Sequence, residues 1–130
     1  MQPKVLIVED DRFLSSMLKT NLERDGFGVE QAFEGEEGLA KLKSAKPDLV
    51  LLDLMMPKMS GFELLGHVVA DPELNTIPVI VMSNIGEEGD VNRARDLGVV
   101  DYFVKAQTPL DNMGSIVREH LKKSVAPKQN

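Results

Sequence analysis

Several side chains able to do chemistry stand directly after short apolar runs of this 130-residue chain. They are two neighbouring acids, a third acid, a hydroxyl and an amine: Glu9, Asp10, Asp53, Ser83 and Lys105. Three carboxylates that are brought together repel one another, and a hard divalent cation such as Mg²⁺ relieves that repulsion. An ionised aspartate is also a competent nucleophile for phosphorus. If the fold gathers these side chains, they predict a site for metal-assisted phosphoryl transfer.

Short apolar runs alternate with helical patterns along the whole chain. Four of the runs are continuous and branched, as is typical of strands that are buried on both faces of a parallel sheet, namely 5–8, 49–52, 79–82 and 102–104. A fifth segment alternates apolar and polar residues, which favours an edge strand over 29–33. Apolar residues at helical spacing lie between these strands, over 14–22, 36–46, 60–70 and 87–97, and again after 108.

This alternation predicts a parallel sheet with helices on both faces and right-handed connections. In such a sheet the residues at the carboxyl ends of neighbouring strands converge on one crevice. The topology would therefore bring the acids, the hydroxyl and the amine together. Local signals support the helices: Ser60 and Glu63 have capping-box spacing, and Thr108, Pro109 and Asp111 predict the start of the last helix.

Composition excludes several other kinds of protein. The chain has no cysteine, so disulfides and thiolate metal sites are excluded. Its net charge of −6 argues against direct binding of a nucleic acid backbone. No apolar run reaches the roughly 18 residues of a membrane span, and the first residues lack the features of a signal peptide. We therefore expect a cytoplasmic protein without membrane insertion.

Four segments resemble the receiver domain of a bacterial two-component response regulator, of the single-domain type found in chemotaxis. They are VLIVEDD (5–11), DLVLLDLMMPKMSGFELL (48–65), IPVIVMSN (77–84) and DYFVKA (101–106). The resemblance implies an α/β fold that is flavodoxin-like: a doubly wound five-stranded parallel sheet of order 2-1-3-4-5 with five helices. The domain would span residues 1–124, with 125–130 as a flexible tail or the start of a linker.

The resemblance also implies the roles of the acids. Asp53 would be the phosphoacceptor. Glu9 and Asp10 would hold Mg²⁺ together with Asp53 and the backbone carbonyl of Met55, and Mn²⁺ is an alternative cation. The second Asp that phosphatases commonly place two residues after their nucleophile is replaced here by Met55. That replacement argues against an enzyme that turns over outside substrates, and retention of the polar set argues against a docking domain that is never phosphorylated.

The remaining site residues would bind the phosphoryl group or respond to it. Ser83 and Lys105 match the phosphate-binding positions of the family, and Tyr102 matches its aromatic switch, which would enter the space that Ser83 leaves. Met55 and Ile85 match positions that flank the phosphoryl group. Both are apolar and fairly large here, so we expect slow self-dephosphorylation.

The chain departs from the family in one place, where Ala106 replaces the proline that usually follows the lysine. A cis bond before a residue other than proline costs about 3 kcal/mol, so we expect a trans bond. Because the bond after Lys105 differs from the one usual in the family, the direction of the Lys105 side chain and the shape of the following loop could differ as well.

The resemblance implies phosphorylation by a sensor histidine kinase or a phosphotransfer protein. The phosphoryl group would change the surface of the fourth helix, fifth strand and fifth helix, and so the binding of a downstream protein target or of an output domain. A phosphorylation-dependent homodimer is left open.

Overall fold

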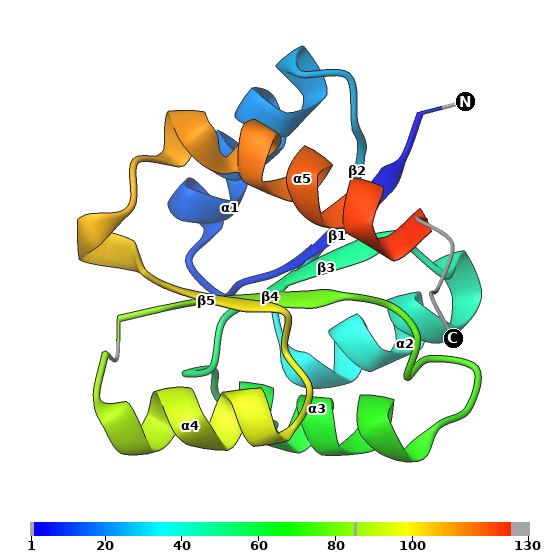
Figure 1. Cartoon of the computed structure of the whole chain (residues 1–130), viewed down its shortest axis with the longest axis vertical. Coiled ribbons are helices and arrows are strands. Elements are labelled where there is room, and N and C mark those ends of the chain that lie inside the picture. Colours follow the sequence, from blue (N-terminus) through cyan, green and yellow to red (C-terminus); the bar gives the residue numbers. More distant parts are fainter. Residues whose placement is uncertain (1, 85, 126–130) are drawn as a thin grey trace.

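A computed structural model of the protein describes residues 2–84 and 86–125. Its strands form one parallel sheet in the order β2-β1-β3-β4-β5 (Figure 1). The strands are β1 (Lys4–Val8), β2 (Gly28–Ala32), β3 (Leu49–Leu52), β4 (Val79–Ser83) and β5 (Asp101–Val104). The helices between and after them are α1 (Arg12–Arg24), α2 (Gly35–Ala45), α3 (Gly61–Ala70), α4 (Glu88–Asp96) and α5 (Met113–Val125). This arrangement confirms the predicted fold class and strand order.

The sheet is covered on both faces, with α1 and α5 on one side and α2, α3 and α4 on the other (Figure 1). Strand β1 shows why the central runs are continuously apolar. Val5 and Ile7 pack in the core beneath α1 and α5, whereas Leu6 and Val8 pack in the core beneath the other helices. Because successive side chains of a strand point to opposite faces, a central strand needs apolar residues at every position.

Side-chain caps define where two of the helices begin. Asp11 accepts a hydrogen bond from the amide of Leu14 at 3.1 Å and so caps α1. Ser60 and Glu63 form the predicted capping box at the start of α3, with bonds of 3.2 and 3.5 Å. Both caps satisfy amides that have no partner within the helix.

The predicted start of the last helix at Thr108 is wrong. The hydroxyl of Thr108 donates to the carbonyl of Val104 at 3.1 Å instead of capping a helix. Two short 3₁₀ turns, Lys105–Gln107 and Leu110–Asn112, then carry the chain from β5 to α5. The helix therefore begins only at Met113.

Helix α5 continues to Val125, one residue beyond the predicted limit of the domain. Residues 126–130 of the expected tail lie outside the described residues, so the domain limit stays a prediction. None of the helices in the described part of the chain has the length and apolar character needed to cross a membrane.

Candidate functional site

The register of the sheet places the candidate site at the carboxyl ends of the strands. Val8 of β1 pairs with Leu52 of β3, and Leu52 pairs in turn with Val81 of β4. Asp53 follows β3 directly, and its amide donates to the carbonyl of Val8 at 2.9 Å. Glu9, the residue after Val8, is thereby fixed beside Asp53.

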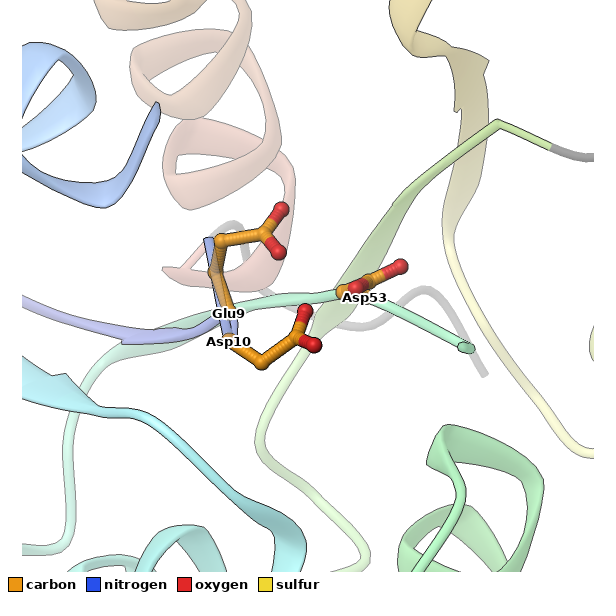
Figure 2. A group of neighbouring side chains, drawn as sticks. All are labelled: Glu9, Asp10 and Asp53. Atoms are coloured by element: carbon orange, nitrogen blue, oxygen red, sulfur yellow. The ribbon is translucent and has the colours of Figure 1, made fainter. Parts of the chain in front are cut away.

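The three predicted acids form one cluster. Glu9, Asp10 and Asp53 each offer a carboxylate oxygen, and these oxygens all lie within 4.8 Å of one another. Figure 2 shows the three side chains at the ends of neighbouring segments, with their carboxylates turned toward a common space. Glu9 and Asp53 are only 3% and 4% exposed, whereas Asp10 is exposed. An all-oxygen cluster with one open side fits a Mg²⁺ or Mn²⁺ ion that keeps several water ligands.

Lys105 lies against the same cluster. Its Nζ is 2.5 Å from Oε1 of Glu9 and 3.6 Å from Oδ2 of Asp53. The described part of the chain has no cis peptide bond, so the bond before Ala106 is trans as expected. The replacement of proline by alanine therefore does not turn Lys105 away from the acids.

The carboxyl group of Asp53 is hard to ionise in the metal-free protein. The pKa of Asp53 is raised from its usual 3.8 to about 7, first by burial and then by the neighbouring negative charge of Glu9. The ammonium group of Lys105 and a hydrogen bond from the amide of Met55 lower the pKa in part. A proton and a cation thus compete for the same group of oxygens.

Ser83 and Tyr102 come together beside this cluster. Ser83 is fully buried at the end of β4, and Tyr102, on the adjacent β5, is 9% exposed. Burial raises the pKa of the Tyr102 hydroxyl, and a hydrogen bond with Ser83 lowers it in part. The ring of Tyr102 packs in the core without any phosphoryl group at Asp53. Its movement into the space that Ser83 would leave stays a prediction.

Of the two positions expected to flank the phosphoryl group, Met55 is among the described residues. Met55 is 59% exposed, and its amide donates to Oδ1 of Asp53 at 3.2 Å. Its side chain therefore stands at the open side of the site. Ile85 lies outside the described residues.

Two glycines allow helices α2 and α3 to pack closely against the loop that follows Asp53. A Cβ at Gly61 would lie 2.5 Å from the carbonyl oxygen of Asp53 and 2.6 Å from Cα of Leu54. A Cβ at Gly35, the first residue of α2, would lie 2.7 Å from Cβ of Met59. The resemblance to the receiver family marks Gly61 as part of the turn that follows Asp53, but no signal in the sequence distinguishes Gly35 from an ordinary helix start.

The fold and the site together define a doubly wound α/β protein with an acidic pocket and a lysine at the carboxyl edge of its sheet. The family model described as the response regulator receiver domain matches residues 5–117. The chain therefore belongs to the family of response regulator receiver domains. Phosphorylation and signalling in two-component systems are the general role of this family, and its members bind Mg²⁺ or Mn²⁺ at an acidic pocket.

Individual proteins show the same likeness. The chain is 40% identical over 105 residues to the phosphate regulon transcriptional regulatory protein PhoB of Rhizobium meliloti (strain 1021), covering 81% of this chain and 46% of that protein. It also resembles the crystal structure of a CheY-like response regulator receiver domain protein from Methanospirillum hungatei JF-1. That match has a TM-score of 0.87 and 27% identity, and it covers 95% of this chain and 97% of the other.

A third likeness is to the Mn²⁺-bound form of the response regulator Rcp1, with a TM-score of 0.83 and 28% identity over 97% of this chain and 99% of the other. The chain spans less than half the length of PhoB and of other curated transcriptional regulators that it matches. It matches solved receiver domains over nearly their whole length.

Proposed function

We propose that Asp53 accepts a phosphoryl group from a phosphohistidine on a sensor histidine kinase or a phosphotransfer protein. A carboxylate oxygen of Asp53 attacks phosphorus, the bond between phosphorus and the histidine nitrogen breaks, and that nitrogen keeps the electron pair and takes up a proton. The observation that carries this proposal is the position of Asp53, which lies at a strand end within 4.8 Å of two other acids and 3.6 Å from Lys105.

Glu9, Asp10, Asp53 and the backbone carbonyl of Met55 would hold Mg²⁺, with Mn²⁺ as an alternative. A bound cation would neutralise charge on the phosphoryl oxygens. Lys105 would leave its contact with Glu9 and stabilise another of these oxygens. The three acids fit this role because they offer only oxygen donors and because one of them, Asp10, lies open to the solvent.

The phosphorylated side chain of Asp53 carries about two negative charges, in place of the one on the carboxylate, and new acceptor oxygens. The hydroxyl of Ser83 would turn from Tyr102 toward these oxygens, and Tyr102 would then settle differently against β4. We propose that this change alters the surface of α4, β5 and α5, and with it the binding of a downstream protein or of an output domain. The greater length of the curated relatives supports an output domain.

Incubation with Mg²⁺ and acetyl phosphate tests the central claim. The intact mass of the protein should rise by one phosphoryl group, and Asp53→Asn should remove that increase. Addition of a chelator before the phosphodonor should also prevent it. Phosphorylation that persists in Asp53→Asn, or that does not depend on a divalent cation, would contradict the proposal.

A further inference from the structure

Strand β2 forms an edge of the sheet, because it stands first in the strand order and pairs only with β1 among the described strands. The amide of Gly28 donates to Pro3 and the carbonyl of Ala32 accepts from Glu9, so both residues face β1. Since successive residues of a strand turn their backbone groups to opposite sides, Gln31 and Phe33 face the open edge. Outward amides and carbonyls at an edge are a template on which another strand can pair.

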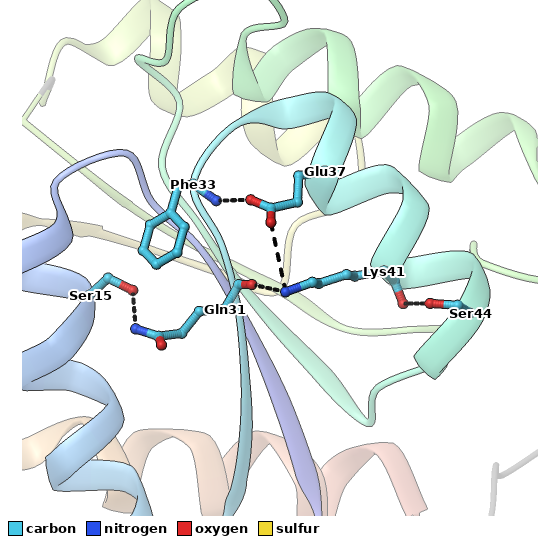
Figure 3. A network of polar contacts seen from close by, with 6 residues as sticks. All are labelled: Ser15, Gln31, Phe33, Glu37, Lys41 and Ser44. Carbon is cyan, nitrogen blue, oxygen red and sulfur yellow. Dashed lines mark hydrogen bonds and ion pairs between the residues drawn. The ribbon is translucent and has the colours of Figure 1, made fainter.

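Two side chains of α2 occupy one outward carbonyl and one outward amide at the Ala32 end of this edge (Figure 3). The amide of Phe33 donates to Oε1 of Glu37 at 2.6 Å, and Nζ of Lys41 donates to the carbonyl of Gln31. Glu37 and Lys41 are one helical turn apart and also pair with each other at 3.8 Å. One therefore supplies the acceptor and the other the donor that an added strand would supply.

The same stretch of strand is fixed from the α1 side as well. The side-chain amide of Gln31 donates to the hydroxyl of Ser15 at 2.9 Å (Figure 3), and Ser15 is fully buried. Because this contact holds Gln31 in place, its carbonyl stays directed toward Lys41. The end of β2 is thus held by hydrogen bonds from α1 on one side and from α2 on the other.

We propose that Glu37 and Lys41 close the β2 edge against pairing with β2 of a second copy of this chain. A second β2 edge carries the same outward carbonyl and amide, so two edges can satisfy each other around a twofold axis. The pair on α2 satisfies the same groups within one molecule, where no association entropy is lost. This inference is independent of phosphorylation.

Removal of both side chains tests the proposal in the unphosphorylated protein, with no phosphodonor present. Light scattering after size exclusion should show self-association of Glu37→Ala/Lys41→Ala that is stronger than that of the wild type by about tenfold or more, since two hydrogen bonds are freed. The matched control is Glu36→Ala/Lys43→Ala, which removes one acid and one base from exposed positions of the same helix. Equal masses of the two double variants at every concentration would overturn the proposal.

Hydrogen exchange of the Phe33 amide decides the case even if the double variant does not fold. In Glu37→Ala this amide should exchange about tenfold faster than in the wild type. In Glu37→Gln, which keeps an oxygen acceptor, its rate should stay within about twofold of the wild type. Exchange of the Phe33 amide at the wild-type rate in Glu37→Ala would show that Glu37 does not close the edge.

Discussion

At the scale of single residues, burial and neighbouring charge act most strongly on the pKa of Asp53. Asp53 is buried at the carboxyl end of β3, so its carboxylate is poorly solvated, and Glu9 places a second negative charge beside it. The proposed nucleophile, which has to be ionised in order to attack phosphorus, is therefore held in surroundings that favour the protonated form. Lys105 compensates for part of this cost, and a cation would compensate for more.

The pH dependence of stability should reveal this cost. Between about pH 4 and 7 the folded metal-free protein keeps a proton on Asp53 that the unfolded chain has lost, because the pKa is raised from 3.8 to about 7. The free energy of unfolding should therefore fall as the pH rises through this window. Asp53→Asn should be more stable than the wild type at pH 8, on the order of 2 kcal/mol, and equal to it near pH 4.

Urea unfolding of both proteins with a chelator present measures this difference at each pH. Addition of Mg²⁺ should then stabilise the wild type and leave Asp53→Asn nearly unchanged. A difference between the two proteins that does not vary with pH would show that Asp53 titrates as an ordinary carboxyl group.

The exposed thioether of Met55 should slow the loss of the phosphoryl group, because it cannot orient a water molecule for attack. In Met55→Asn the amide can hold such a water, so the phosphoryl half-life should fall by roughly two- to tenfold. The half-life is measured by intact mass after the phosphodonor is removed. Met17→Asn is the control, since Met17 is also exposed but lies on α1. An unchanged or longer half-life in Met55→Asn would contradict this role.

At the scale of elements, the start of α3 sets the shape of the loop that follows Asp53. Gly61 allows the first turn of the helix to touch the backbone of Asp53 and Leu54. Backbone atoms cannot move aside as a flexible side chain can, so any added Cβ must displace the loop itself.

Gly61→Ala should therefore destabilise the protein by about 2 kcal/mol and slow its phosphorylation. Gly66→Ala is the matched control on the same helix, because a Cβ there meets nothing within 4 Å. That substitution should stabilise the protein by about 0.5–1 kcal/mol, as alanine favours a helix interior. Thermal unfolding and the rate of phosphorylation by acetyl phosphate measure both effects. Equal behaviour of the two variants would show that the loop tolerates a Cβ at Gly61.

The sequence predicts elements better than it predicts the contacts between them. Asp53 and Ser83 could be placed at one edge because each follows an apolar run, and parallel strands end together. Thr108 looked like a helix cap because its spacing to Asp111 is correct, but its hydroxyl bonds to Val104, a contact that depends on the path of the loop. The hydrogen bond between Tyr102 and Ser83 likewise depends on how β5 lies beside β4, which no local pattern encodes.

At the scale of the whole molecule, α4 has fewer buried residues than any other α-helix in the described part of the chain. Ala94 is its one buried residue. The guanidinium group of Arg93 lies 4.0 Å from the centre of the Phe62 ring and links α4 to α3. A helix with few core contacts can move at low cost when the adjacent strand changes. The response to phosphorylation should therefore appear first in α4 and the neighbouring β5.

Hydrogen exchange before and after phosphorylation tests this expectation. Amides of α4 and β5 should change their exchange rates by about tenfold, whereas amides in the middle of α2 should not change. Ser83→Ala should still be phosphorylated, because Asp53 and Lys105 are intact, but its α4 amides should respond much less. Ser44→Ala, at an exposed position of α2, is the control. A full response of the α4 amides in Ser83→Ala would mean that the effect of phosphorylation reaches α4 without the Ser83 hydroxyl, which bonds to Tyr102. The coupling between Asp53 and α4 would then have to pass through Lys105 and the loop after β5.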